Sequence, residues 1–280
     1  MDIWNLKKLA EIIQQHTNDE REALNQASWL WEEGMGFNNP VKEKITESEI
    51  DWLGDSLKRL KNGEPVQYIV GHSYFFGLKI LVTPDVLIPR PETEELVAWI
   101  IEDSRQQQES KRILDIGAGS GCIPIALKNF FKKRADITAI DISGAALSVA
   151  NQNCLMHKVN VNLIRRDFLT EGLDGLEKFN IIVSNPPYIS KVEADPDLIK
   201  GLAFEPATAL FAEGNDPDIF YRRMSTGLKT HLEENGVVYL ELNEFRANTI
   251  KEIFQNEGWD VQIRKDMQGL SRMMRLQLLL

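Results

Sequence analysis

Residues 112–121 read Arg-Ile-Leu-Asp-Ile-Gly-Ala-Gly-Ser-Gly, a short apolar run that ends in three closely spaced glycines. The apolar run is typical of a buried strand, and residues 122–127 after it have the apolar spacing of a helix. Strand, glycine turn and helix open a nucleotide-binding βαβ unit, in which glycines let the backbone approach a ligand and the helix start offers free N–H groups. This stretch therefore predicts an α/β fold with a ligand site at the turn.

The spacing of the glycines indicates which ligand the turn suits. They follow the pattern G-x-G-x-G, whereas the dinucleotide fingerprint G-x-G-x-x-G needs a glycine at position 122, which is Cys122. We therefore expect the turn to wrap around an uncharged part of a ligand rather than around a pyrophosphate. The candidate ligand-binding residues of the turn are Gly117, Ala118, Gly119, Ser120 and Gly121.

Acidic residues lie at the ends of the next two predicted strands. Asp141 follows the strand 136–140, about 20 residues beyond the turn, where a carboxylate can accept both hydroxyls of a ribose. The alternative role of Asp141 is to stabilise the start of the following helix. A third strand, residues 159–164, ends near Asp167 and Phe168. We expect Asp167 to accept from an adenine amino group and Phe168 to lie against the ring; an ordinary core position is the alternative for Phe168.

The tetrapeptide Asn185-Pro186-Pro187-Tyr188 follows another apolar strand, residues 179–184. Two prolines fix φ and carry no N–H, so the carbonyls of Asn185 and Pro186 are held in an extended turn that no helix consumes. A side-chain amide and an aromatic ring beside such carbonyls suit a planar –NH2 group, whose hydrogens find acceptors while the ring covers its face. We predict that Asn185, Pro186, Pro187 and Tyr188 are the catalytic residues. A proline-rich turn that only caps the strand is the alternative.

The apolar spacing divides the chain in two. Residues up to about 65 show helical spacing only, which predicts a small all-α domain, and residues 46–49 form a capping box that starts one of its helices. Residues 75–82 are expected to form a hairpin between the two parts. From residue 93 onward strands and helices alternate, which implies a mostly parallel sheet with helices on both faces.

The last two predicted strands, residues 260–264 and 273–279, are separated only by a turn. We expect them to form an antiparallel hairpin at one edge of the sheet.

Composition and charge exclude several classes of protein. The 280 residues are 43% hydrophobic, which is enough for one good core and a smaller second one. There is no run of 18 apolar residues, so no membrane span is expected. The net charge is −10, and residues 1–85 contain 14 acidic and 9 basic side chains. Because proteins that grip phosphate backbones usually show the opposite balance, no direct binding of nucleic acid is expected.

The cysteines and histidines point to a reducing compartment and no metal site. Cys122 and Cys154 are the only cysteines and have no metal-like or disulfide spacing, and four histidines are scattered. The N-terminus lacks a basic region followed by an apolar core, so no secretory signal is expected. We therefore expect a cytoplasmic protein without a metal.

Three further segments accompany the glycine turn, Asp141 and the Asn-Pro-Pro-Tyr motif. Residues 87–94 read Leu-Ile-Pro-Arg-Pro-Glu-Thr-Glu, residues 204–210 read Phe-Glu-Pro-Ala-Thr-Ala-Leu, and residues 266–272 read Asp-Met-Gln-Gly-Leu-Ser-Arg. In this order, over nearly the whole chain, they resemble the bacterial release-factor glutamine methyltransferases, the HemK/PrmC family of class I S-adenosylmethionine-dependent methyltransferases. Two departures are Phe168, where some members have tryptophan, and residues 241–245, which lack the Gly–Gln pair often found there.

The resemblance implies an α/β class I methyltransferase (Rossmann-like) fold, with a mostly parallel seven-stranded sheet, an antiparallel edge hairpin and a small N-terminal all-α domain. It implies a helical substrate-recognition domain in residues 1–65, a linking hairpin and loop in residues 66–92, and a methyltransferase domain in residues 93–280. Residues 1–65 would contact a release factor; a purely structural lid is the alternative. The segment around Pro89 is expected to wall the cofactor or to be a rigid linker, and Glu205 is expected to position its own loop.

The implied cofactor is S-adenosyl-L-methionine, and the residues expected to hold it are Gly117, Ala118, Gly119, Ser120, Gly121, Asp141, Asp167, Phe168 and Asn185. The implied reaction is N5-methylation of the glutamine in the Gly-Gly-Gln loop of peptide-chain release factors, which modulates translation termination. The alternatives are a glutamine methyltransferase of a ribosomal protein and an adenine or guanine amino-methyltransferase of nucleic acid, which would need a basic groove. A dinucleotide-dependent oxidoreductase is disfavoured by Cys122, and a non-catalytic binding protein by the complete Asn-Pro-Pro-Tyr motif.

Overall fold

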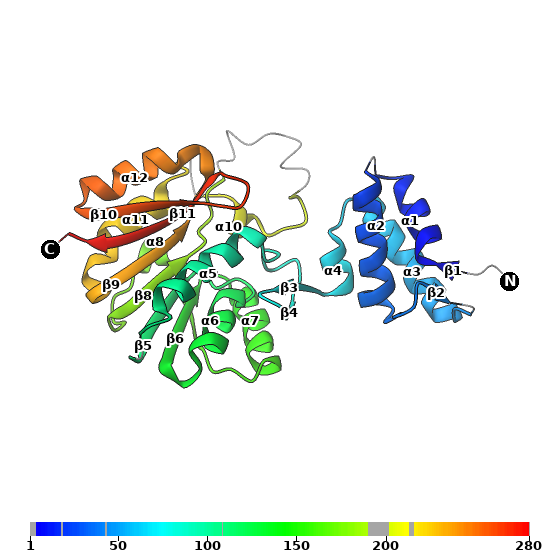
Figure 1. Ribbon diagram of the computed structural model, residues 1–280, viewed down its shortest axis with the longest axis horizontal. Coiled ribbons are helices and arrows are strands. Elements are labelled where there is room, and N and C mark those ends of the chain that lie inside the picture. The colour runs from blue at the N-terminus through cyan, green and yellow to red at the C-terminus, as the bar shows by residue number, and fades with distance from the viewer. Residues whose placement is uncertain are drawn as a thin grey trace. The chain divides into compact units, whose positions relative to one another are not determined.

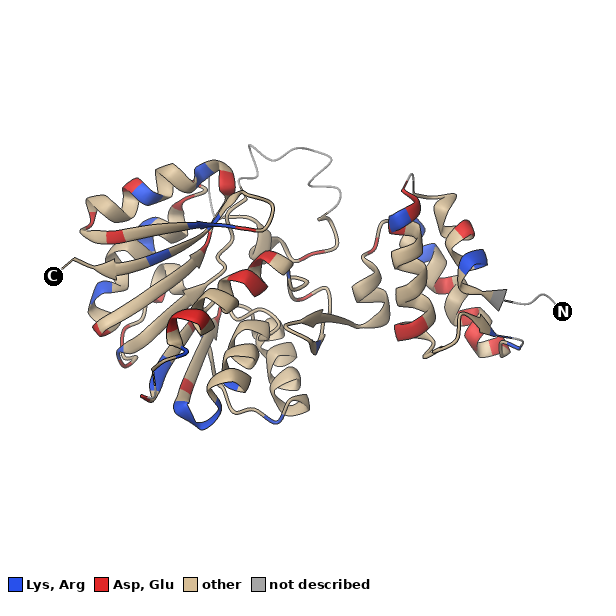
Figure 2. Cartoon of the chain, in the orientation of Figure 1, with Lys and Arg blue, Asp and Glu red and all other residues tan. Residues whose placement is uncertain are grey.

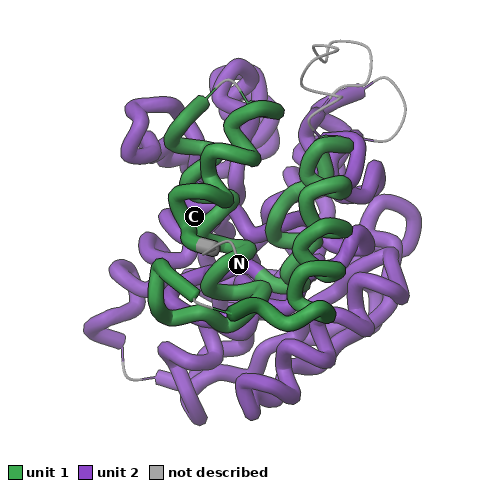
Figure 3. Tube along the Cα trace, turned by 90° about the vertical axis from the view of Figure 1, so that its right-hand side faces the viewer, with its two compact units in different colours: residues 1–72 green, residues 73–280 purple. Residues whose placement is uncertain are grey.

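A computed structural model describes the chain over residues 4–17, 19–42, 44–107, 109–189, 202–212 and 216–279. Two compact units divide it, unit 1 in residues 1–72 and unit 2 in residues 73–280 (Figure 3). Unit 1 therefore extends beyond residue 65, the position at which we expected the helical part to end. A further helix, α4 (Val66–Val70), occupies the start of the stretch that was expected to be hairpin and loop.

Unit 1 is built mainly of helices, as its apolar spacing predicted. Its elements are β1 (Trp4–Asn5), α1 (Leu6–Gln14), α2 (Glu20–Ser28), the π-helical turn η1 (Trp29–Gly34), β2 (Val41–Lys42), α3 (Glu47–Lys61) and α4 (Val66–Val70). The capping box at the start of α3 is confirmed, because the Thr46 side chain accepts from the Glu49 N–H while the Glu49 carboxylate accepts from the Thr46 N–H. The expectation of helices alone is wrong in one detail, since β1 and β2 pair as a two-stranded antiparallel sheet.

The core of unit 1 is a cluster contributed by its helices. Leu9 of α1, Ala27 of α2, and Leu30 and Trp31 of η1 have no exposed surface. The Trp31 indole N–H donates to the Asn39 carbonyl at 2.7 Å, so the ring is buried without leaving a polar group unsatisfied. Unit 1 therefore has a hydrophobic core of its own.

Unit 2 alternates strands and helices. Its elements are β3 (His72–Phe75, which begins at the unit boundary), β4 (Leu78–Leu81), α5 (Pro91–Ser104), β5 (Lys111–Ile116), α6 (Cys122–Phe131), η2 (Lys132–Arg134), β6 (Ala135–Asp141), α7 (Gly144–Met156), β7 (Asn162–Arg165), α8 (Phe168–Glu171), β8 (Phe179–Ser184), α10 (Ala207–Leu210), α11 (Ile219–Gly227), η3 (Lys229–His231), β9 (Leu232–Glu241), η4 (Glu244–Arg246), α12 (Ala247–Asn256), β10 (Trp259–Lys265) and β11 (Ser271–Leu278). The hairpin predicted near residues 75–82 is present as the two-stranded sheet of β3 and β4.

The main sheet of unit 2 has seven strands in the order β10-β11-β9-β8-β5-β6-β7 (Figure 1). Strands β5 to β9 pair in parallel, and β11 pairs antiparallel with both β9 and β10. The predicted α/β fold, with a mostly parallel sheet and an antiparallel hairpin at one edge, is confirmed. Among the described residues, no helix is both long enough and apolar enough to cross a membrane.

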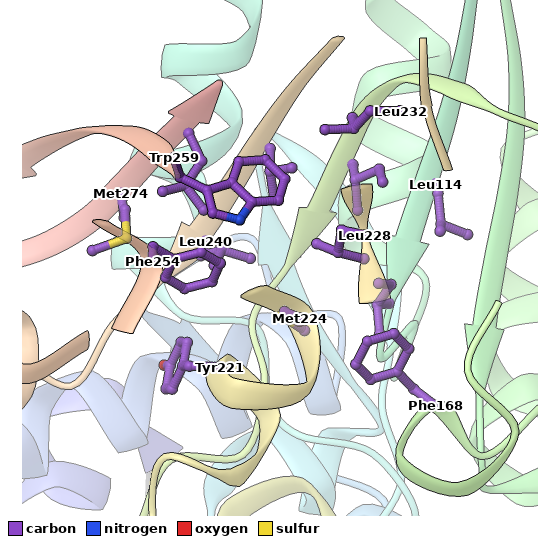
Figure 4. Packing of buried hydrophobic residues seen from close by; sticks show 14 of the residues in the cluster. Leu114, Phe168, Tyr221, Met224, Leu228, Leu232, Leu240, Phe254, Trp259 and Met274 are labelled. Atoms are coloured by element: carbon purple, nitrogen blue, oxygen red, sulfur yellow. The ribbon is translucent and has the colours of Figure 1, made fainter. Parts of the chain in front are cut away.

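Successive residues of β9 show that both faces of the sheet are covered. Val238 and Leu240 lie in a buried cluster with residues of α11 and α12, including Met224 and Phe254 (Figure 4). Tyr239 points to the other face, where its ring meets Trp99 of α5 edge-on at 5.8 Å between centroids. This alternation places apolar side chains on both faces, as expected of a parallel sheet with helices on each side.

Because parallel strands run in one direction, β5, β6, β8 and β9 all end at the same edge of the sheet. The glycine turn follows β5, Asp141 ends β6, Asn185 follows β8 and Glu241 ends β9. Along the backbone drawn in Figure 2, the positions of acidic and basic residues are interspersed in both units. The fold thus brings residues that are far apart in sequence to a single edge of the sheet.

Candidate active site

A cavity of about 640 Å³ opens at this edge of unit 2. Its volume lies within the range of small-molecule sites. The predicted site residues that line it are Gly117, Ala118, Gly119, Ser120, Asp141, Asp167, Phe168, Asn185, Pro186 and Pro187. Two other predicted residues, Gly121 and Tyr188, are not part of its lining. Most of the predicted site residues therefore line a single cavity.

The glycine turn has a backbone that side chains rarely adopt. Gly117, Gly119 and Gly121 have φ of +87°, +51° and +79°. A Cβ at Gly119 would meet nothing within 4 Å, so that side of the turn faces open space. A Cβ at Gly121 would lie 3.1 Å from the Cβ of Ala150 on α7. Gly121 therefore serves the packing of α6 against α7, while the first two glycines border the cavity.

Asp141 is tied to the glycine turn by its carboxylate. Oδ2 accepts from the Gly119 N–H and Oδ1 from the Ser143 N–H, both at 2.8 Å. Burial raises the pKa of Asp141, and these N–H groups act in the opposite direction. A carboxylate has about four acceptor sites, so each oxygen can accept one more hydrogen bond. Asp141 therefore holds the glycine turn and the backbone before α7 and also lines the cavity, so its role toward a ribose stays a prediction.

Asp167 and Phe168 lie where β7 passes into α8. Asp167 is the N-cap of α8 and accepts from the Leu169 N–H at 2.9 Å and the Thr170 hydroxyl at 2.6 Å. Phe168 is 5% exposed and belongs to the buried cluster on one face of the sheet. Because both residues also line the cavity, their structural roles leave them available to a ligand.

The Asn-Pro-Pro-Tyr motif forms the wall that follows β8. The Asn185 Nδ2 donates to Thr93 Oγ1 at 3.1 Å. Within the described part of the chain, nothing donates to Asn185 Oδ1 or to the Pro186 carbonyl. The Tyr188 hydroxyl donates to Glu241 Oε1 at 3.4 Å, and burial raises the pKa of that hydroxyl. Asn185 and Pro186, which line the cavity, thus each keep an acceptor that no described residue occupies, while the Tyr188 hydroxyl contacts Glu241 at the end of β9.

Glu241 lies behind this wall and was not predicted from the sequence as a site residue. Its Oε2 accepts from the Thr93 hydroxyl at 2.6 Å, and Glu241 as a whole is only 2% exposed. Burial raises the pKa of Glu241 to about 7, although the hydrogen bond from Thr93 and the charge of Arg272 lower it. One signal in the sequence could have indicated Glu241 as a site residue. It is a charged residue at the end of the apolar run Val237-Val238-Tyr239-Leu240.

A second buried carboxylate joins two loops that border the cavity. Glu205 accepts from the Arg90 guanidinium at 2.5 Å and from the Ile88 N–H at 3.2 Å. Arg90 and Pro89 line the cavity, and Pro91 begins α5. These contacts support a cavity wall at this segment, and they agree with a role of Glu205 in positioning its own loop.

The comparisons with known proteins place the chain among methyltransferases. A family model described as Methyltransferase small domain matches residues 97–256. A release factor glutamine methyltransferase of Flavobacterium psychrophilum is 40% identical over 225 residues, which are 79% of this chain and 78% of the relative. Another, of Lactococcus lactis, is 41% identical over 255 residues, which are 89% and 88% of the two chains. The chain belongs to the release factor glutamine methyltransferase family.

Membership of the release factor glutamine methyltransferase family confirms the resemblance that the sequence motifs indicated. Among solved structures, a methyltransferase from Pyrococcus furiosus matches with a TM-score of 0.54 at 21% identity, covering 80% of this chain and 96% of that one. This likeness concerns the fold. The roles of individual residues in this family member therefore depend on the geometry described above.

One buried carboxylate of this family member has no hydrogen-bond partner among the described residues. Asp115, in β5, has no exposed surface, and neither of its carboxylate oxygens accepts a hydrogen bond from any residue that the structure describes. Burial, with a contribution from the charge of Asp141, raises the pKa of Asp115 well above its ordinary value. Asp115 is not part of the cavity lining, so we assign it no role in ligand binding.

Proposed function

We propose that this chain transfers a methyl group from S-adenosylmethionine to the side-chain nitrogen of the glutamine in the Gly-Gly-Gln loop of peptide-chain release factors. The observation that carries the proposal is the pair of acceptors at the cavity wall, Asn185 Oδ1 and the Pro186 carbonyl, neither of which receives a hydrogen bond from the described residues. A primary carboxamide has two N–H donors, one for each acceptor. The names of the relatives supply the substrate class.

The cavity suits the cofactor on several counts. The glycine turn presents open space at Gly119, and the half-buried Asp141 carboxylate keeps acceptor capacity for ribose hydroxyls. Asp167 and Phe168 offer an acceptor and an aromatic ring to an adenine. When bound, S-adenosylmethionine supplies an electrophilic methyl group on a sulfonium, which is a good leaving group. These residues would hold the cofactor beside the Asn185 wall.

The chain's own residues would act by orientation rather than by strong base catalysis. An amide nitrogen is a poor nucleophile because its lone pair is delocalised into the carbonyl. Holding one N–H on Asn185 Oδ1 and the other on the Pro186 carbonyl lets the nitrogen pyramidalise and localises that lone pair. Glu241, with a pKa of about 7, is far too weak a base to ionise the neutral carboxamide before transfer. Transfer of the methyl would release the thioether and leave a positively charged amide nitrogen, which is so acidic that it gives up one N–H proton to water without a strong base. Well-oriented reactants gain on the order of 7–11 kcal/mol, so positioning can supply most of the acceleration.

The helical unit, unit 1, offers surface that a protein substrate could contact. A glutamine on a folded protein must be recognised through surface beyond the side chain itself. Unit 1 has its own hydrophobic core, and the stretch 1–85 carries five more acidic than basic side chains. We infer that residues 1–65 contact the release factor, while residues 93–280 carry out methyl transfer.

The test is transfer of labelled methyl from S-adenosylmethionine to a purified release factor. Parallel acceptors are a release factor with the loop glutamine changed to alanine, ribosomal proteins and duplex DNA. Label on the intact release factor alone supports the proposal. Equal label on the alanine variant, or preferential label on DNA or a ribosomal protein, would overturn it. Asn185→Ala should lower turnover far more than cofactor affinity, whereas equal losses would indicate a role of Asn185 in the fold or in cofactor binding.

A further inference from the structure

Three side chains from distant parts of unit 2 form one chain of hydrogen bonds. The Asn185 Nδ2 donates to Thr93 Oγ1 at 3.1 Å, and the Thr93 hydroxyl donates to Glu241 Oε2 at 2.6 Å. Asn185 follows β8, Thr93 lies in the first turn of α5, and Glu241 ends β9. Of the three, only Asn185 and Thr93 reach the cavity.

The number of protons fixes the direction of this chain. Once Glu241 is ionised its carboxylate can only accept, so the single hydroxyl proton of Thr93 must go to Glu241. Thr93 Oγ1 can then only accept from Asn185, which it does from Nδ2. If the amide were flipped, Asn185 Oδ1 would face a hydroxyl that has no proton left to donate. The carboxylate therefore determines, through Thr93, which end of the Asn185 amide is turned away from Thr93.

Burial makes this orientation selective. Thr93 is 3% exposed and Glu241 is 2% exposed, so water has little access to satisfy a flipped amide. Both residues are fixed by regular structure, because Thr93 donates its backbone N–H to Arg90 at the start of α5 and Glu241 pairs with Met273 of β11. A rigid support of this kind can hold a functional amide in a single orientation.

The same carboxylate also contacts the fourth residue of the motif. Glu241 Oε1 accepts from the Tyr188 hydroxyl at 3.4 Å, while Oε2 accepts from Thr93. One buried carboxylate therefore contacts Tyr188 directly and Asn185 through a hydroxyl. No other carboxylate among the described residues contacts both ends of the motif in this way.

We propose that Thr93 and Glu241 are positioning residues that hold the Asn185 amide so that Oδ1, and not Nδ2, is presented to the substrate. This inference rests on the proposed function, because it explains how the site selects a substrate that offers N–H donors. If Nδ2 were presented instead, its N–H donors would face the N–H donors of the substrate carboxamide, and no hydrogen bond could form between them. The orientation of Asn185 is thus a determinant of specificity that is set outside the motif itself.

The kinetic test compares Thr93→Val with Thr93→Ser. Valine keeps the shape and removes the hydroxyl, whereas serine keeps the hydroxyl. We expect kcat for release-factor methylation to fall by about 10- to 100-fold in Thr93→Val, with KM for S-adenosylmethionine changed less than about threefold. Thr93→Ser should recover at least about tenfold of the lost kcat. Equal kcat in the two variants, whether high or low, would overturn the role of the hydroxyl, and thermal unfolding checks that both variants are folded.

A spectroscopic test needs no substrate and separates this inference from the proposed function. In protein labelled with ¹⁵N-asparagine, the Asn185 side-chain amide signal is assigned by its loss in Asn185→Asp. We expect that signal to move in Thr93→Val and to titrate with Glu241 in the wild type, but not in Glu241→Gln. If the Asn185 amide signal is unchanged in both Thr93→Val and Glu241→Gln, the positioning role is overturned, even if methyl transfer to release factors is observed.

The titration must be attributed to Glu241 and not to its neighbours. The titratable and charged groups that face it are Glu92 on α5, Tyr188 after β8, Tyr221 on α11 and Arg272 on β11. Loss of the transition in Glu241→Gln assigns it to Glu241, whereas its survival would assign it elsewhere and overturn the inference. If the wild type transfers no methyl group to release factors, the proposed function is wrong. The response of the Asn185 amide signal still tests whether Thr93 and Glu241 position that amide.

Discussion

Glu241→Gln is expected to stabilise the protein at alkaline pH while it impairs the site. The Glu241 side chain is buried, and burial raises its pKa to about 7, against the lowering effects of the Thr93 hydrogen bond and the Arg272 charge. The folded state therefore disfavours the ionised carboxyl. Glutamine has nearly the same shape and carries no charge, so the substitution removes this cost.

The magnitude follows from the two pKa values. The interval from the ordinary value of 4.5 to about 7 corresponds to about 3 kcal/mol of free energy. As pH rises, the unfolded chain loses its proton first and the folded chain only near pH 7. The wild type thus loses stability through this range and bears the full cost above pH 7. Relative to wild type, the free energy of unfolding of Glu241→Gln should rise by about 2 to 3 kcal/mol between pH 5 and pH 8.

The assay is hydrogen exchange of the buried amides of β9 in the full-length chain, at several urea concentrations and at pH 5, 6, 7 and 8. Following β9 isolates unit 2, since the two units need not unfold together. Any constant effect of altered hydrogen bonds cancels in the difference between pH values. Glu234→Gln, at an exposed position of the same strand, is the matched control and should show no comparable trend. A constant difference between Glu241→Gln and wild type from pH 5 to pH 8 would refute the reasoning.

The remaining predictions concern the walls of the cavity. Gly121→Ala should lower the free energy of unfolding by about 1 to 2 kcal/mol more than Gly175→Ala in chemical unfolding, because both glycines have φ near +80° but only the Cβ at 121 would contact Ala150. Equal losses would place the cost in the backbone alone. Arg90→Ala should cost about 2 to 4 kcal/mol in the same assay, because it leaves the buried Glu205 carboxylate without its guanidinium partner. A loss below about 0.5 kcal/mol would show that the Ile88 N–H suffices for Glu205.

The strands and the glycine turn of unit 2 were predictable because their signals are local. The apolar runs that became β5 and β8 are bounded by residues that cannot continue a strand, and the turn between β5 and α6 needs positive φ at Gly117 and Gly119. The same holds for the capping box of α3. In each case the residues that decide the structure lie within a few positions of one another.

The parts that escaped prediction depend on distant contacts or on very short elements. Thr93 and Glu241 are 148 positions apart, and nothing near either residue indicates the other. The strands β1 and β2 have two residues each, too few to show alternation. Helix α4 has five residues, fewer than two helical turns, and its apolar side chains complete the core of unit 1. Tertiary packing, which local spacing does not encode, decided all of these.

The strand order has a consequence for how the protein is made. β11, residues 271–278, lies between β9 and β10, so the sheet is complete only when a strand that follows both of them in sequence has been inserted between them. Until then β9 keeps an unpaired edge, and Arg272, which joins the loop after β9 to the turn before β11 through Glu244 and Asp266, is absent. A nascent chain halted before residue 271 would therefore hold the glycine turn and the Asn-Pro-Pro-Tyr motif without the strand that pairs with β9, so methyl transfer should begin only after β11 has been made.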